Sequence, residues 1–127
     1  PELTRASLII GSERAHAMDV ERYVAIDNVC AWPILNRLPD GRISAIIFNQ
    51  PTHGGWEGEI ECWLSGDEGR TWTRAGTPVP HEAGIARMNH AAGIAGNGDL
   101  VVIAAGIPLN TCGNTNTLKV QTVGARS

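Results

Sequence analysis

The stretch from Ser65 to Trp72 (Ser-Gly-Asp-Glu-Gly-Arg-Thr-Trp) constrains the fold more than any other part of the chain. Ser65 and Asp67 carry short polar side chains that can bond backbone groups two or three residues further on and close a tight turn. Gly69 offers the positive φ that a Cβ would penalise. Thr71 and Trp72 favour a strand, and the indole favours burial. The stretch therefore predicts a structural hairpin turn rather than a catalytic loop.

These residues fit the pattern S-x-D-x-G-x-T-W, the Asp-box or bacterial neuraminidase repeat. The chain resembles the sialidases and related β-propellers over roughly residues 28–127, and most clearly over residues 31–72. In that family the Asp-box joins the third and fourth strands of a blade, on the face away from the active site. The resemblance implies an all-β fold of antiparallel four-stranded meander blades, in a sialidase-like, six-bladed β-propeller that this chain forms only in part.

Short apolar runs between turn residues predict antiparallel strands along most of the chain. The run Ile43–Phe48 is almost entirely apolar, which predicts a strand covered on both faces. Pro33 lies early in its run, where a strand start or a bulge tolerates it. Pro39-Asp40-Gly41 predicts a tight turn. The expected strands are residues 7–10, 22–26, 30–38, 43–48, 60–64, 71–74, 100–105 and 118–123.

The second half of the chain repeats the first at an offset of 57 residues, since Gly98 follows Gly41 at that interval in a matching turn. We expect three regions: a lead-in segment with strand-like runs (1–27), a complete blade with the Asp-box (28–76) and a second, truncated blade (77–127). The missing outer strand predicts a piece of a longer protein. The alternative is a homotrimer, in which three copies of two blades close a six-bladed ring.

Length and composition narrow the classes of partner. The 127 residues suffice for one modest core but not for a complete propeller. A net charge of −3 with both signs scattered argues against nucleic acid and against a membrane as partners. Cys30, Cys62 and Cys112 form no disulfide framework and no metal motif, so we expect no metal and no cofactor. The cysteines leave the compartment open, and the resemblance favours a secreted or periplasmic one.

Successive antiparallel strands turn at alternating ends, so the expected loops fall into two groups. The turns at Asp40 and Asp67 share one end, and the loops 49–59 and 77–89 share the other. The resemblance implies that this second end holds the active site. The candidate catalytic residues are His53, Glu57 and Arg87, and the candidate substrate-binding residues are Trp56, Glu59, His81, Asn89 and His90. The structural residues of the Asp-box are Ser65, Asp67, Gly69, Thr71 and Trp72.

Each candidate has a chemical reason and a plainer alternative. His53 can bind substrate or move a proton, since imidazole titrates near neutral pH. Glu57 or Glu59 can supply the general acid that glycoside hydrolysis requires. Arg87 can grip the carboxylate of an acidic sugar through two parallel hydrogen bonds, and Trp56 can stack on a sugar ring. The alternative for each residue is an ordinary solvated or packing role.

Three further candidates lie near the boundary between the blades. His81 follows Pro78-Val79-Pro80, a stiff segment that can aim the imidazole inward. Asn89 and His90 have the alternative role of satisfying backbone groups. A glycan is the expected partner of the whole set.

The resemblance implies that the parent protein is a sialidase-like glycoside hydrolase acting on glycans, as an exo-α-sialidase or with a related sugar specificity, and that this piece alone is inactive. The sequence also differs from the family. Ala31 stands where the family's Arg-Ile-Pro motif has its arginine, and no aspartate lies between Asp40 and Asp67, where the family has its acid/base aspartate. Two alternatives stay open: a non-catalytic glycan- or protein-binding propeller, and a histidine-based polysaccharide lyase.

Overall fold

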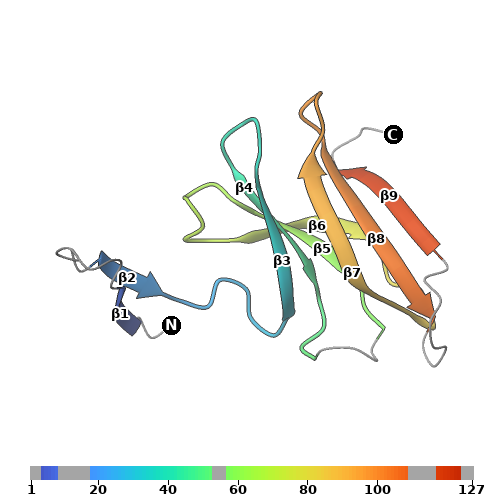
Figure 1. Ribbon diagram of the computed structural model, residues 1–127, viewed down its shortest axis with the longest axis horizontal. Helices are drawn as coiled ribbons and strands as arrows, with labels where there is room; N and C mark the ends of the chain where they lie inside the picture. The colour runs from blue at the N-terminus through green and yellow to red at the C-terminus, as the bar shows by residue number, and fades with distance from the viewer. Residues whose placement is uncertain (1–3, 9–17, 53–56, 109–116, 124–127) are drawn as a thin grey trace.

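The computed structural model describes residues 4–8, 18–52, 57–108 and 117–123, and each regular element within these ranges is a β-strand (Figure 1). The strands are β1 (Thr4–Leu8), β2 (Met18–Arg22), β3 (Cys30–Arg37), β4 (Ile43–Phe48), β5 (Ile60–Ser65), β6 (Thr73–Val79), β7 (Ile85–Ile94), β8 (Leu100–Pro108) and β9 (Thr117–Val123). The strands form three antiparallel sheets, β1-β2, β3-β4-β5-β6 and β7-β8-β9, each in chain order. The predicted all-β, antiparallel meander is confirmed, and the described sheets do not close on one another.

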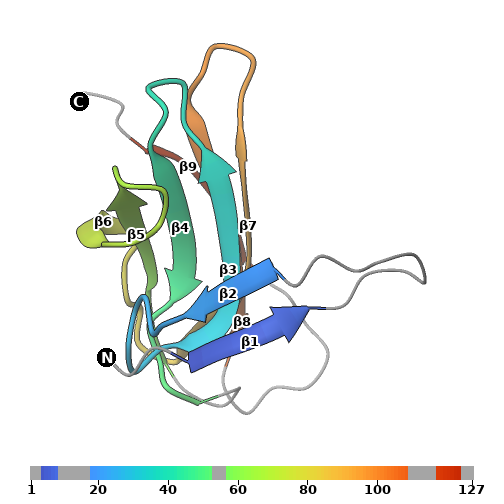
Figure 2. The ribbon, with the colours of Figure 1, turned by 90° about the vertical axis from the view of Figure 1, so that its left-hand side faces the viewer.

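The four-stranded and three-stranded sheets pack face to face. β3 lies beside β7, and β6 contacts β9. Figure 2 shows β3 and β7 running side by side, and Figure 1 shows the β1-β2 hairpin on the side of β3 away from β7. Burial of apolar side chains between the two sheets supplies most of the driving force for this packing. The buried residues of the interface are Ile46, Phe48, Ile60, Cys62, Val79, Leu100, Val102 and Ala104.

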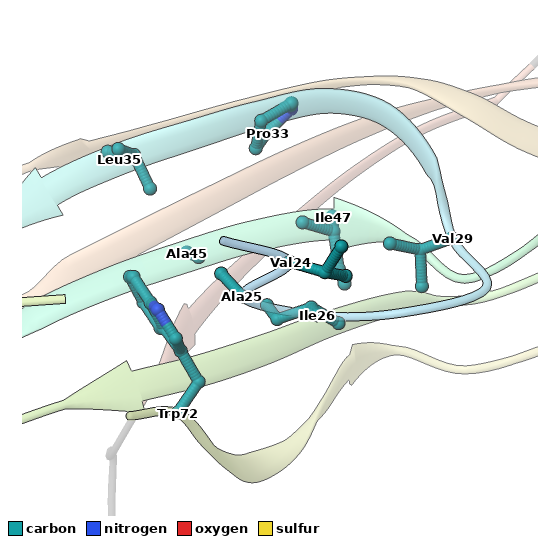
Figure 3. Close-up of a pocket in the computed structure, with 9 residues that line it drawn as sticks. All are labelled: Val24, Ala25, Ile26, Val29, Pro33, Leu35, Ala45, Ile47 and Trp72. Carbon is teal, nitrogen blue, oxygen red and sulfur yellow. The ribbon is translucent and has the colours of Figure 1, made fainter. Parts of the chain in front are cut away.

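β4 is buried on both of its faces, as its apolar sequence predicts. Ile46 and Phe48 point into the core between the sheets. Ala45 and Ile47 point the other way, toward the segment Val24–Val29, which crosses that face of the sheet (Figure 3). A strand with apolar neighbours on both sides has no need of the polar alternation seen in half-exposed strands.

The two sheets are repeats of one unit, offset by 57 residues. In the first unit, Leu38 N–H donates to Arg42 O at 2.8 Å and Gly41 N–H donates to Leu38 O at 2.9 Å. The second unit forms the same two bonds, from Ala95 N–H to Asp99 O and from Gly98 N–H to Ala95 O, both at 2.8 Å. The glycines have φ of +89° and +90°. The predicted repeat is therefore confirmed at the level of backbone geometry.

The turn between β5 and β6 closes through its own side chains. The buried Ser65 hydroxyl accepts the Gly69 N–H and donates to Asp67 Oδ1, both at 2.8 Å. Asp67 accepts the Thr71 N–H at 2.8 Å and the Thr71 hydroxyl at 2.6 Å. The Thr71 hydroxyl is the largest of the effects that lower the Asp67 pKa to about 2. Gly69 has φ of +86°, the predicted positive value.

Two contacts tie this turn to distant parts of the chain. The Tyr23 hydroxyl donates to Gly69 O, which also accepts the Trp72 indole N–H at 2.8 Å. The Arg37 guanidinium at the end of β3 makes two hydrogen bonds to the Glu68 carboxylate, at 3.1 and 2.8 Å. The turn therefore also anchors the segment that precedes β3.

Three details of the predicted strands are corrected or sharpened. The strand expected at residues 22–26 is wrong, because β2 ends at Arg22 and the residues after it run across the sheet face. The last strand of the first unit begins at Thr73 rather than Thr71, because Thr71 is held in the turn by Asp67. Pro33 lies at an irregularity in β3, where Trp32 has φ of +58° and the pairing with β4 shifts register.

Candidate functional site

At the predicted active-site end, residues 57–59 before β5 converge with residues 80–84 before β7. The loop expected at 77–89 is shorter than predicted, because β6 extends to Val79 and β7 begins at Ile85. Both stretches lie at the opposite strand ends from the three glycine turns at residues 38–42, 66–72 and 95–99 (Figure 1). The glycine turns bond mostly within themselves. Residues 57–59 and 80–84 instead bond to each other through the Glu57 carboxylate. These contacts and the neighbouring pair of Glu82 with Arg87 form the candidate site.

Glu57 organises the site by bonding twice to the 80–84 connection. Its Oε2 lies 2.6 Å from His81 Nε2, and its Oε1 accepts the Gly84 N–H at 2.7 Å. Gly58 fixes the position of Glu57, because a Cβ on this buried glycine would lie only 2.5 Å from the Phe48 ring. The backbone can thus press against the core here only where the residue is glycine.

The bonds to Glu57 also decide which protonation state it keeps. The Gly84 N–H, followed by His81, lowers the pKa of the Glu57 carboxyl below its ordinary value. Hydrogen bonds to a carboxylate stabilise the charged form. Glu57 therefore stays ionised at neutral pH, which suits a group that orients His81 and does not suit the general acid proposed from the sequence.

Arg87 on β7 is the most deeply buried charged residue among those described, with 2% of its side chain exposed. Its Nη2 donates to Glu82, whose side chain is 60% exposed. Its Nε and Nη1 are buried and have no hydrogen-bond partner in the described structure. Buried donors almost always have partners, so two spare nitrogens on one guanidinium call for a physical explanation.

A guanidinium with spare, desolvated donors has the chemistry to bind an oxyanion. Arg87 Nη2 forms one bidentate edge with Nε and a second with Nη1. Glu82 uses only Nη2, so Nε and Nη1 have no partner in the described structure. Carboxylates and phosphates match such edges with two parallel hydrogen bonds. The Glu82 side chain is 60% exposed, so packing does not hold it in place.

Glu59 lies in a separate cluster. Arg74 Nη2 lies 2.8 Å from Glu59 Oε1, and Arg74 Nε lies 2.9 Å from Glu61 Oε1. Glu61 also accepts the Trp63 indole N–H at 2.7 Å. The sequence reasoning did not single out Glu61 or Arg74, although the alternation of residues 59, 61 and 63 along a strand predicts one shared face. The polar groups of this cluster bond to one another.

Four candidates remain: His90, Asn89, His53 and Trp56. The two ring nitrogens of His90 lie 2.9 Å from Met88 O and 3.3 Å from Ile46 O, which is the backbone-satisfying arrangement. Asn89 is exposed on β7. His53 and Trp56 lie outside the described residues.

The described residues include no cluster of three or more His, Cys, Asp or Glu side chains able to hold a metal ion. They also include no helix long and apolar enough to cross a membrane. Comparison of the chain with protein-family models, with curated proteins and with solved structures finds no match. The geometry of the site is therefore the basis for assigning a function.

Proposed function

We propose that this chain is part of a sialidase-like glycoside hydrolase with β-propeller architecture, and that it binds the carboxylate of an acidic glycan through Arg87. The observation that carries the proposal is the buried guanidinium with two unpartnered nitrogens. The propeller architecture is supported by the bonding of the Asp-box turn and by the repeat of 57 residues in two packed sheets.

Glu82 acts in this proposal as an internal substitute for the ligand. A buried guanidinium without a partner anion is unstable, so the free protein pairs Arg87 with its own carboxylate. A sugar carboxylate replaces Glu82, and the charge on Arg87 stays paired throughout the exchange. The ligand also fills Nε or Nη1, which Glu82 leaves without a partner. This additional bond favours the ligand over the internal carboxylate.

A second candidate is a histidine-based polysaccharide lyase, which the 2.6 Å contact between Glu57 and His81 favours. In β-elimination a base removes the proton next to the sugar carboxylate, and the bond to the leaving glycosidic oxygen breaks. An ionised Glu57 orients the His81 ring for the first step. Arg87 stabilises the charge that develops on the carboxylate. Glucuronate-type sugars carry a carboxylate in the required place.

Calorimetric titration of the chain with N-acetylneuraminic acid, glucuronic acid and glucose tests the proposal. Glucose is the matched control, because it differs from glucuronic acid by a CH₂OH group in place of the carboxylate. We expect the acids to bind and glucose not to bind. Equal binding of glucuronic acid and glucose, or no binding of either acid, would contradict the role of Arg87.

Activity assays on the full-length parent protein then separate the candidate functions. Release of free sialic acid from a sialoside identifies the hydrolase, and an unsaturated, ultraviolet-absorbing product from a uronate polymer identifies the lyase. Carboxylate-dependent binding without either product identifies a non-catalytic glycan-binding propeller. His81→Gln is the diagnostic variant, because it should abolish lyase turnover while leaving carboxylate binding intact.

A further inference from the structure

Arg87 is closed off from solvent in the arrangement described above. Its side chain is 2% exposed, and the two nitrogens left for a ligand carboxylate, Nε and Nη1, are buried. The Glu82 carboxylate occupies Nη2, the nitrogen that both bidentate edges share. A ligand that binds through two parallel hydrogen bonds therefore reaches the guanidinium only after part of its surroundings moves.

The connection 80–84 is the part of these surroundings best able to move. All five of its residues are exposed, whereas Pro78 and Val79 before it are buried and β7 after it belongs to the three-stranded sheet. Exposed segments open locally at a lower free-energy cost than strands that pack in a core. The connection carries Glu82, so its displacement takes the Glu82 carboxylate away from Arg87.

Both ends of this connection are tied to the Glu57 carboxylate. Its Oε1 accepts the Gly84 N–H at 2.7 Å, and its Oε2 lies 2.6 Å from His81 Nε2. Within the connection, Ile85 N–H donates to Glu82 O at 3.1 Å and closes a turn. Gly84 has φ of +76°, which glycine adopts without the strain that a Cβ would add. The observed conformation thus depends on one carboxylate and one glycine.

We infer that residues 80–84 form a lid over Arg87 and that Glu57 is the latch that holds the lid closed. The inference rests on the proposed function, because it concerns how a sugar carboxylate reaches Arg87. In the closed state Glu82 pairs with Arg87, and in the open state the ligand carboxylate replaces Glu82. Since only the open state binds, the apparent association constant is the intrinsic one multiplied by the fraction of open molecules. Glu57 is therefore a positioning residue that sets the affinity without touching the ligand.

Solvent exchange of the Arg87 Nε–H, followed by NMR, tests the lid without any ligand. This proton is buried, so it exchanges only when its surroundings open. Glu57→Ala removes both ties to the lid, and we expect exchange about tenfold faster than in the unmodified chain. Glu68→Ala is the matched control, because Glu68 also accepts two side-chain bonds, from Arg37, but at the opposite strand ends. It should leave the exchange unchanged.

Gly84→Ala opens the lid without altering Glu57. Nothing lies within 4 Å of the added Cβ, so the effect comes from the positive φ alone. We again expect exchange of the Arg87 Nε–H about tenfold faster, because the closed turn becomes strained. Gly96→Ala is the control, since a Cβ there also meets open space and the φ of Gly96 is not positive.

Calorimetry with glucuronic acid then connects the lid to the site. Glu57→Ala and Gly84→Ala should bind about tenfold more tightly than the unmodified chain, because more molecules are open. Unchanged Nε–H exchange in either variant would overturn the inference, and so would faster exchange with unchanged affinity. Faster exchange in chains that all fail to bind glucuronic acid would support the lid and contradict the proposed function instead. Amide exchange across β4 verifies that each variant is folded.

Discussion

The turn between β5 and β6 and the connection between β6 and β7 both carry charged side chains, but they use them in opposite ways. In the turn, Asp67 accepts bonds from Ser65 and Thr71, and the polar groups satisfy one another. Just after the connection, near the start of β7, Arg87 is buried with one bond to Glu82 and two nitrogens that have no partner in the described structure. The hydrogen bonds within the turn satisfy the Asp67 charge and support the fold. The unsatisfied donors of Arg87 do not, and we propose that they serve a ligand.

Among the variants that test this difference, we expect Arg87→Met to have the largest effect. We expect carboxylate affinity to fall by about 100-fold, because charge-assisted hydrogen bonds contribute about 1.5–3 kcal/mol each. We also expect the free energy of unfolding to rise by about 1–2 kcal/mol, since an apolar side chain of similar size removes the unsatisfied buried charge. Calorimetry and urea unfolding measure the two quantities.

The control for Arg87→Met is Arg42→Met, at an arginine in an exposed pair with Asp40. It should leave the carboxylate affinity unchanged. An Arg87→Met variant that loses stability and keeps its affinity would make Arg87 a structural residue like those of the turn.

Ser65→Ala tests the other side of the comparison. The substitution leaves the buried Gly69 N–H without its acceptor, so we expect the free energy of unfolding to fall by about 1–3 kcal/mol. Carboxylate binding should not change, because the turn lies at the opposite strand ends. Thr73→Ala, at an exposed position on β6, is the control and should have little effect in urea unfolding. Unchanged stability would show that the turn does not depend on its side-chain bonds.

Gly98→Ala and Gly41→Ala compare the repeated turns. Both glycines have positive φ, so each substitution should lower the free energy of unfolding by about 1–2 kcal/mol. Gly98→Ala should cost more, since its Cβ would lie 3.2 Å from Pro39 Cγ, whereas nothing lies within 4 Å at Gly41. Thermal unfolding of both variants provides the ranking. The reverse order would contradict the packing of the second turn against the first sheet.

The smallest expected effect is the pH dependence of the turn, because solvent screens the exposed Asp67. Its pKa is lowered from 3.8 to about 2 in the folded chain. The stabilisation is therefore complete above the unfolded value and is lost as pH falls from about 4 toward 2. Urea midpoints across this range should fall less steeply for Asp67→Asn than for the unmodified chain. Identical slopes would contradict the assignment.

The sequence predicted most of the sheet architecture because the controlling signals are local. The residues of the Asp-box close their own turn, and Gly41 and Gly98 mark the repeat. The strand expected at residues 22–26 failed because Tyr23 is tied to Gly69, far away in the sequence. Apolar and aromatic content cannot distinguish a strand from a segment that crosses a sheet face.

The sequence predicted the end of the sheets at which Glu57 and His81 lie, but not the contacts that they make. Glu57, His81 and Arg87 were selected for their side-chain chemistry, and strand order predicted the end at which they lie. The ionised state of Glu57 depends on the Gly84 N–H, which no sequence pattern reveals. The burial of Arg87 likewise depends on how the two sheets pack, so the sequence could not separate it from an exposed arginine.

The most direct test of the account is the affinity of Glu82→Gln for glucuronic acid. The substitution removes the competing carboxylate and leaves Arg87 buried with its donors available. We predict binding about tenfold tighter than that of the unmodified chain, with glucose still failing to bind, because the loss of one charge-assisted hydrogen bond removes about 1.5 kcal/mol of competition. Binding that is unchanged or weaker would contradict the claim that Arg87 is held ready for a ligand carboxylate.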